Sequence, residues 1–146
     1  MKILFLGDAG VGKTSLIRKI LGTNFQPIYI PTQSITREII YFYGEEHELI
    51  DVSGMRKYGV DSTTFTDYDI AVIIYDKKTS CKNMNFWANC INPDKKVKFI
   101  GNKNDIYNFN ELSAKTHTRE QIMNWIMKWK YRCMLCVFVL CVCKIK

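Results

Sequence analysis

The sequence predicts a three-layer α/β fold, in which helices cover both faces of a mostly parallel sheet. Three short apolar segments carry this prediction: Lys2–Leu6, Ile70–Tyr75 and Val97–Ile100. Segments this apolar are typical of parallel strands that are buried on both faces. Stretches with helical spacing alternate with them, which is the pattern of an open α/β sheet. In such a sheet a ligand binds at the carboxyl ends of the strands.

Three helices are expected between and after these strands. Thr14–Leu21 and Thr118–Arg132 place apolar residues at helical intervals, and a third helix is expected over Met84–Ile91. Thr118 is followed three residues later by Gln121, which is the pattern of a capping box at a helix start.

A hairpin adds one antiparallel strand to the predicted sheet. Two strand segments, Ile35–Tyr43 and Glu48–Val52, lie on either side of Gly44-Glu45-Glu46, which is a turn signal. The segments 23–34 and 53–68 lack regular spacing, and both are expected to be loops.

Length and composition narrow the classes of protein. A chain of 146 residues fits one domain with a real core, and it carries a formal net charge of +7. The apolar run before Gly7 is too short for a secretion signal, and none approaches the roughly 20 residues of a membrane span. Six cysteines are therefore expected to be reduced thiols in the cytoplasm. Aromatic residues are not interleaved with Lys and Arg, so no nucleic-acid partner is expected.

The stretch Gly7–Thr14 fits the phosphate-binding pattern GxxxxGK[ST] at every fixed position, between a predicted strand and a predicted helix. In this pattern successive backbone N–H groups point at the phosphates, and the N-terminus of the helix that follows the loop adds partial positive charge. The lysine reaches the outer phosphates, and the threonine hydroxyl suits Mg²⁺. The predicted phosphate-binding residues are Ala9, Gly10, Val11, Gly12, Lys13, Thr14 and Ser15.

A second motif, Asn102-Lys103-Asn104-Asp105, follows the strand Val97–Ile100 and has the form NKxD. Guanine presents two hydrogen-bond donors side by side, and the carboxylate of Asp105 can accept both. Adenine would leave a polar group of the site unpaired, which is costly. The sequence therefore predicts a guanine nucleotide, and this motif argues against a phosphate-loop kinase or ATPase.

Between these motifs lies Asp51-Val52-Ser53-Gly54, which has the form DxxG and closes the strand Glu48–Val52. Asp51 can reach Mg²⁺ through water, and the Gly54 amide can sense a γ-phosphate. A lone DxxG is a weak signal, but here it stands in the correct order between two stronger ones.

With these residues the chain resembles the Ras superfamily of small GTPases over most of its length. The stretch from Ile74-Tyr75-Asp76 to Phe86-Trp87, followed by Gly101-Asn102-Lys103, is most similar to Rab and Ran members. The resemblance implies a phosphate-loop NTPase fold that binds GTP or GDP with Mg²⁺ and acts as a switch. It also implies effector and regulator proteins that bind through residues 23–34 and 53–68.

The resemblance assigns roles to further residues. Thr32 matches the threonine that binds Mg²⁺ and the γ-phosphate in the GTP state. Phe25 falls where the family stacks an aromatic ring beside guanine, and Tyr29 falls where a tyrosine covers the phosphates. The family's SAK motif, which contacts the guanine oxygen, is matched by Ser113, Ala114 and Lys115.

One departure from the family concerns hydrolysis. The glutamine that orients the attacking water is replaced by Met55, whose thioether cannot hold water by two hydrogen bonds. No arginine precedes Thr32 to compensate. Since phosphoryl transfer depends on positioning and charge, the catalytic set Lys13, Thr32 and Gly54 is expected to hydrolyse GTP slowly. The alternative is a pseudo-GTPase whose partner binding ignores the nucleotide.

A second departure is geometric, because only residues 106–112 separate Asp105 from Ser113. Seven residues span at most about 25 Å, so the family's usual helix between NKxD and SAK is expected to be missing. In one arrangement 113–115 is the guanine loop and Thr118–Arg132 is the final helix. In the other, Thr118–Arg132 is the penultimate helix, 137–143 is the sixth strand, and the guanine loop lies near Cys143-Lys144.

The last fourteen residues form a segment of their own. The predicted GTPase domain covers 1–132, and the tail 133–146 combines four cysteines with valines and flanking Lys and Arg residues. Lipidated cysteines beside basic charge would attach the protein to the cytosolic face of a membrane. A buried terminal strand accounts for the β-branched valines equally well.

Overall fold

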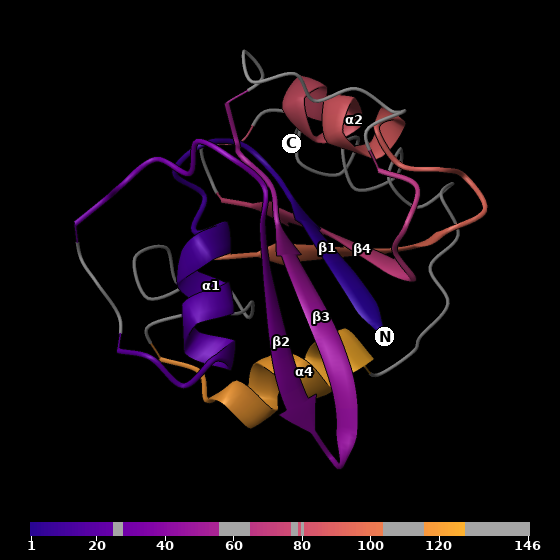
Figure 1. Ribbon diagram of the computed structural model, residues 1–146. Coiled ribbons are helices and arrows are strands. Elements are labelled where there is room, and N and C mark those ends of the chain that lie inside the picture. Colours follow the sequence, from indigo (N-terminus) through magenta and orange to yellow (C-terminus); the bar gives the residue numbers. More distant parts are fainter. Residues whose placement is uncertain (25–27, 56–64, 77–78, 80, 104–115, 128–146) are drawn as a thin grey trace.

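The computed structural model describes residues 1–24, 28–55, 65–76, 79, 81–103 and 116–127. Five strands form one sheet in the order β2-β3-β1-β4-β5 (Figure 1). Their bounds are β1 Lys2–Leu6, β2 Thr36–Phe42, β3 Glu45–Asp51, β4 Ile70–Tyr75 and β5 Lys96–Gly101.

The sheet is parallel except at one edge. β1 lies in the centre and pairs in parallel with β3 and β4, and β4 pairs in parallel with β5. β2 is antiparallel to β3. Phe5 of β1 lies opposite Asp51 on one side and Val72 on the other, so the carboxyl ends of the parallel strands meet at one edge. The predicted fold class is confirmed.

Helices cover both faces of this sheet (Figure 1). α1 (Lys13–Ile20) and α4 (Arg119–Met127) pack on the face that holds Ile3 and Phe5 of β1. α2 (Cys81–Asn89) packs on the opposite face, against Leu4 and Leu6. This split follows from the alternation of side chains along a strand, which gives each layer its own apolar surface.

The α4 helix begins as the sequence predicts. The Gln121 backbone N–H donates to the Thr118 hydroxyl at 3.2 Å, and the Thr118 N–H donates to the Gln121 side chain at 2.8 Å. These reciprocal bonds form a capping box. Ile122, Met123 and Ile126 then enter the core shared with α1.

The hairpin turn differs from the prediction. β3 begins at Glu45, so the turn is Tyr43-Gly44 and not Gly44-Glu45-Glu46. Both turn residues have positive φ, 52° at Tyr43 and 79° at Gly44. Two-residue hairpins require this conformation because it matches the twist of the flanking strands. The sequence pattern predicted that Tyr43 is the last residue of a strand, whereas its positive φ makes it a turn residue.

The tail 133–146 and its cysteines lie outside the described residues, as does the end of the helix predicted over Thr118–Arg132. Within the described part of the chain, none of the helices combines the length and apolar character needed to cross a bilayer.

Candidate nucleotide-binding site

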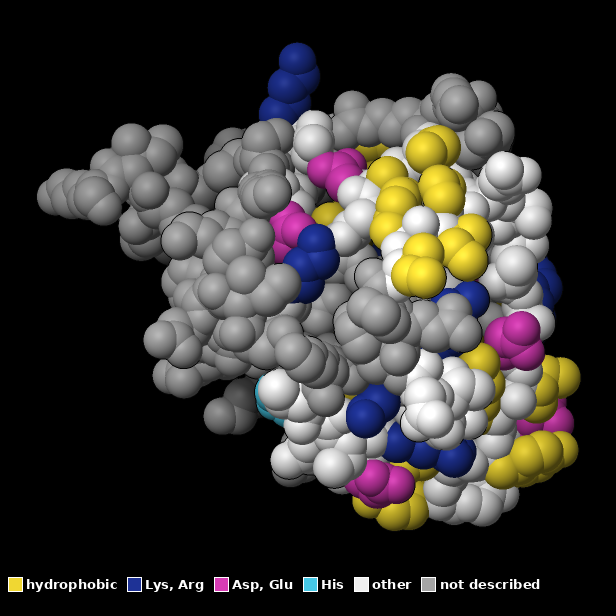
Figure 2. All heavy atoms as spheres, turned by 90° about the vertical axis from the view of Figure 1, so that its left-hand side faces the viewer, with side chains coloured by type: hydrophobic (Ala, Val, Ile, Leu, Met, Phe, Trp, Pro, Cys, Tyr) yellow, Lys and Arg dark blue, Asp and Glu magenta, His cyan; other side chains and the backbone are white. Residues whose placement is uncertain are grey.

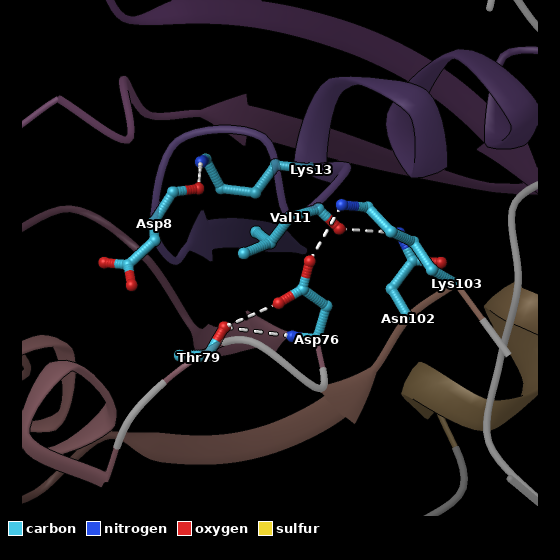
Figure 3. Close-up of polar contacts among 7 residues, drawn as sticks. All are labelled: Asp8, Val11, Lys13, Asp76, Thr79, Asn102 and Lys103. Carbon is cyan, nitrogen blue, oxygen red and sulfur yellow. Dashed lines mark hydrogen bonds and ion pairs between the residues drawn. The ribbon is translucent and has the colours of Figure 1, made fainter. Parts of the chain in front are cut away.

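The predicted motifs meet at the carboxyl edge of the parallel strands. The loop 7–12 connects β1 to α1, Asp51 ends β3, Asp76 follows β4 and Asn102 follows β5. This edge is where open α/β sheets bind their ligands. Figure 3 shows the side chains of Asp76 and Asn102, which follow β4 and β5, turned toward the loop 7–12.

Two glycines of the loop are required by their surroundings. Gly12 has a φ of +95°, and a Cβ there would lie 2.3 Å from the side-chain nitrogen of Asn102. Gly7 has a φ of +142°, and a Cβ there would lie 2.2 Å from the Ile74 carbonyl oxygen. A side chain at Gly12 would displace the Asn102 amide, and one at Gly7 would collide with the backbone of β4. Only glycine fits at these two positions, where the loop packs closely against β4 and against the residue that follows β5.

Lys13 spans the base of this loop. Its ammonium group donates to the carbonyl oxygens of Gly7 at 2.8 Å and Asp8 at 2.9 Å. The side chain is buried, and burial lowers its pKa from 10.5 to about 8, against the opposing charges of Asp51 and Asp8. An ammonium group held among backbone carbonyls at a helix N-terminus is suited to a phosphate oxygen.

Three oxygen-bearing side chains come together beside Lys13. The Thr14 hydroxyl donates to Asp51 Oδ2 at 2.6 Å and lies 2.9 Å from the Thr32 hydroxyl. Because Thr14 has a single hydroxyl proton, Thr32 is the donor in the second bond. The first predicted loop, 23–34, is thus joined to the phosphate loop and to β3.

These residues fit a magnesium ion. Asp51 is 2 % exposed, and its Oδ1 atom has no hydrogen-bond partner among the described residues. Burial raises the pKa of this carboxyl, while the Thr14 hydroxyl and the Lys13 charge oppose that shift. A buried carboxylate oxygen without a partner, close to two hydroxyl groups, is a donor set that Mg²⁺ prefers.

The NKxD segment contacts the phosphate loop directly. The Asn102 side-chain N–H group donates to the Val11 carbonyl at 2.9 Å, and this bond joins residues 91 positions apart (Figure 3). Lys103 has a positive φ of 64°, and its ammonium group lies 2.8 Å from Asp76 Oδ2. The start of the predicted base-reading motif is therefore fixed to both the phosphate loop and the end of β4.

The DxxG segment touches the phosphate loop through its glycine. A Cβ on Gly54 would lie 2.4 Å from the Ala9 nitrogen and 2.5 Å from the Asp8 carbonyl carbon. The next residue, Met55, donates its backbone N–H to the Ser53 hydroxyl at 3.2 Å. Gly54 thus lies beside the loop that the sequence assigns to phosphate, and Met55 directly follows it in the chain.

The other predicted residues are placed less closely or fall outside the described part. Tyr29 is 57 % exposed, and Ser15 lies in the first turn of α1. Outside the described residues lie Phe25, Asp105, Ser113, Ala114 and Lys115.

Comparison with known proteins agrees with this geometry. The family described as "Ras of Complex, Roc, domain of DAPkinase" matches residues 2–105, which span the phosphate loop, the DxxG segment and the NKxD segment. The chain belongs to the Ras superfamily of small GTPases. This Ras-superfamily chain is 30 % identical over 126 residues to the Ras-related protein RABG1 of Arabidopsis thaliana. It is 29 % identical over 122 residues to the Ras-related protein Rab-32D of Dictyostelium discoideum.

A third relative is the GTP-binding protein RHO4 of Saccharomyces cerevisiae, at 30 % identity over 124 residues. The alignments cover 74 %, 72 % and 77 % of this chain. They cover 60 %, 54 % and 43 % of RABG1, Rab-32D and RHO4, so this small-GTPase chain matches about half the length of its relatives. Two of the three are Rab-related, which agrees with the predicted Rab-like character.

Sequence reasoning missed two acidic residues of this small-GTPase site. Asp76 binds Lys103 and also pairs with Thr79, whose hydroxyl donates to Asp76 Oδ1 at 3.2 Å. Asp8 accepts hydrogen bonds from two residues of α2. Asp76 directly follows an apolar strand, and that position at the carboxyl edge was a signal for it. For Asp8 the signal was an acidic residue inside an anion-binding loop.

Proposed function

We propose that this chain is a guanine-nucleotide-binding switch that binds GTP and GDP with Mg²⁺ and hydrolyses GTP slowly. The hydrogen bond from Asn102 to the Val11 carbonyl carries the proposal, because it joins the base-reading segment to the phosphate loop at one site. Membership of the Ras superfamily supports the same function.

The site residues that the structure describes have separate roles in this proposed function. Lys13 contacts the outer phosphates, and the backbone N–H groups of the loop 7–12 donate hydrogen bonds to the phosphate oxygens. Thr14, Thr32 and Asp51 hold Mg²⁺, which when bound neutralises charge on the phosphate oxygens. Gly54 senses the γ-phosphate through its amide.

The switch would operate through residues 23–34 and 53–68. The Thr32 hydroxyl already bonds to Thr14, so the first of these loops responds to what the magnesium site holds. Large apolar side chains within this loop and directly after it are exposed: Ile28, Tyr29, Ile30 and Ile35. Figure 2 shows apolar side chains gathered on this side of the molecule. Exposed apolar surface next to a nucleotide-sensitive loop fits the binding of effector and regulator proteins.

The position of α4 supports the arrangement in which 113–115 is the guanine loop. A helix that connects β5 to a further strand on the outer side would lie on the α2 face, because such crossovers are right-handed. α4 instead packs with α1 on the opposite face. It therefore fits a final helix better than a crossover to a sixth strand at 137–143.

A second candidate function is a pseudo-GTPase that binds partners independently of the nucleotide. Met55 favours it, because this residue stands directly after Gly54 in the sequence, where the family has a glutamine, and a thioether cannot orient water by two hydrogen bonds. Partner binding that is equal with GDP and with a hydrolysis-resistant GTP analogue would support this second function.

The tail 133–146 is compatible with two locations of the protein in the cell. With lipidated cysteines the protein would be peripheral on the cytosolic face of a membrane, and with a terminal strand it would stay in the cytoplasm. Mass spectrometry of the protein from its own cells separates the two, because each acyl or prenyl chain adds a defined mass.

Calorimetric titration with GTP, GDP and ATP in Mg²⁺ tests the main proposal. We expect binding of both guanine nucleotides and none of ATP at the same concentrations. Asp105→Asn should move the preference from guanine toward xanthine nucleotides, whereas Asp94→Asn, in an exposed turn, should leave it unchanged. A folded protein that binds no guanine nucleotide would refute the proposal.

A further inference from the structure

The phosphate loop, which must hold a polyanion in the proposed function, contains the carboxylate of Asp8. Asp8 lies between Gly7 and Ala9, and a negative charge there would repel phosphates unless it is turned away and paired. Figure 3 shows its carboxylate directed away from Lys13. The Asn83 side-chain N–H group donates to Asp8 Oδ2 at 2.6 Å, and the Trp87 indole N–H group donates to Asp8 Oδ1 at 2.8 Å.

Both donors come from the same side of α2. Asn83 and Trp87 are four residues apart, so their side chains lie one above the other on the helix. Trp87 is 0 % exposed, and its indole has one polar group that must be satisfied inside the protein. Bonds to a carboxylate are charge-assisted and directional, so the two together hold Asp8 firmly against α2.

The main chain of Asp8 contacts two further parts of the site. Its carbonyl oxygen accepts the hydrogen bond from Lys13 at 2.9 Å. The peptide between Asp8 and Ala9 lies against Gly54, since a Cβ on Gly54 would come within 2.5 Å of the Asp8 carbonyl carbon. The Asp8–Ala9 peptide therefore contacts both Lys13 and Gly54, so its position affects how these two residues are placed relative to the phosphates.

We propose that Asp8, Asn83 and Trp87 form a positioning network that ties helix α2 to the phosphate loop and favours the triphosphate over the diphosphate. The inference rests on the proposed function, in which the Gly54 amide contacts only the γ-phosphate. Holding the Asp8–Ala9 peptide in register with Gly54 then matters more for GTP than for GDP. Because the linkage works in both directions, a partner that shifts α2 changes this preference.

A swap of the two polar groups tests the network. Asn83→Asp alone places two carboxylates at hydrogen-bond distance and should weaken binding of a hydrolysis-resistant GTP analogue about tenfold, with a smaller change for GDP. Adding Asp8→Asn restores an amide opposite a carboxylate and keeps the net charge of the wild type. We expect this double variant to bind the analogue within about threefold of wild type.

The readout is the ratio of the dissociation constants for the analogue and for GDP, from displacement of a fluorescent nucleotide in Mg²⁺. A ratio unchanged in Asn83→Asp, or not restored in the double variant, overturns the network. Trp87→Phe keeps the buried ring but loses the N–H donor, and it should shift the ratio in the same direction even if Asn83→Asp fails to fold. Trp125→Phe, on the exposed side of α4, is the matched control.

Failure of the network and failure of the proposed function give different results. Wild-type protein that binds neither GDP nor the analogue refutes the switch itself. Wild-type protein that binds both, with variants that match its ratio, refutes only the role of the three positioning residues.

Discussion

The ammonium group of Lys103 lies 2.8 Å from Asp76 Oδ2, so the second residue of the NKxD segment is fixed to the end of a neighbouring strand. Asp76 is 7 % exposed, and its other carboxylate oxygen and its backbone N–H both bond to the Thr79 hydroxyl. Lys103 itself adopts a left-handed conformation, with a φ of 64°. This ion pair holds Lys103 in place, two positions before the predicted base-reading residue Asp105 in the sequence.

Asp76→Asn should weaken guanine-nucleotide binding. The variant keeps the side-chain shape but removes the charge that attracts Lys103, which is only partly exposed. A charge-assisted bond of this kind contributes about 1 kcal/mol after solvent screening, so we expect the dissociation constant of GDP to rise about fivefold. Fluorescent-nucleotide displacement measures it. Asp67→Asn, which removes the surface ion pair with Lys2, is the matched control and should change nothing.

Nucleotide binding should take up a proton near pH 8 through Lys13. Burial lowers the pKa of Lys13 to about 8, so about half of the unbound protein carries a neutral amine at that pH. Phosphate oxygens favour the charged form and raise the pKa on binding. Titration calorimetry in two buffers of different ionisation enthalpy should show an uptake of about half a proton at pH 8 and about a tenth at pH 7.

Lys13→Met is the control for the proton-uptake measurement, and it also tests how the buried charge affects stability. It should abolish the proton uptake and weaken GDP binding, and it should raise the free energy of unfolding of the nucleotide-free protein at pH 7. Lys13 destabilises the folded state at pH 7, because burial lowers its pKa to about 8 and the folded state must hold a charge that water solvates freely in the unfolded state. Removing this charge therefore stabilises the nucleotide-free protein. Urea denaturation that shows the variant to be less stable would contradict this account.

Much of the fold was predictable from the sequence, because hydrophobic runs and capping residues report local structure. Lys2–Leu6 and Ile70–Tyr75 are strands with the predicted bounds, and Thr118 caps α4. The hairpin turn was misplaced because Tyr43 has β propensity and gives no sign of its positive φ. Within the site, Asp8 and Asp76 were missed because their partners come from other elements, and pairing between elements depends on the fold.

Gly54→Ala should selectively impair the triphosphate state. The added methyl group would lie within 2.4 Å of the Ala9 nitrogen, so the DxxG segment would have to move away from the phosphate loop. Since Gly54 is proposed to contact only the γ-phosphate, binding of a hydrolysis-resistant GTP analogue should weaken by about tenfold or more. GDP binding should stay within about threefold of wild type. Equal losses for both nucleotides would argue against a γ-phosphate contact.

Met55→Gln should accelerate GTP hydrolysis. Met55 follows Gly54 beside the phosphate loop, and a glutamine amide there can orient the attacking water by two hydrogen bonds. We expect the single-turnover rate to rise about tenfold. Met55→Leu, which is similar in volume and lacks the amide, should hydrolyse at the wild-type rate. Rapid hydrolysis by the unmodified protein without a partner would show that Met55 is not limiting.

His47→Leu should stabilise the protein. His47 of β3 is 1 % exposed and lies opposite Ile40 of β2, beside the core that includes Phe42 and Leu49. Neither ring nitrogen has a hydrogen-bond partner among the described residues, and a buried polar group without a partner costs folding free energy. We expect urea denaturation to show a gain of about 1 kcal/mol. His117→Leu, at a partly exposed position before α4, should have a much smaller effect, and a loss of stability in His47→Leu would mean that the imidazole is satisfied.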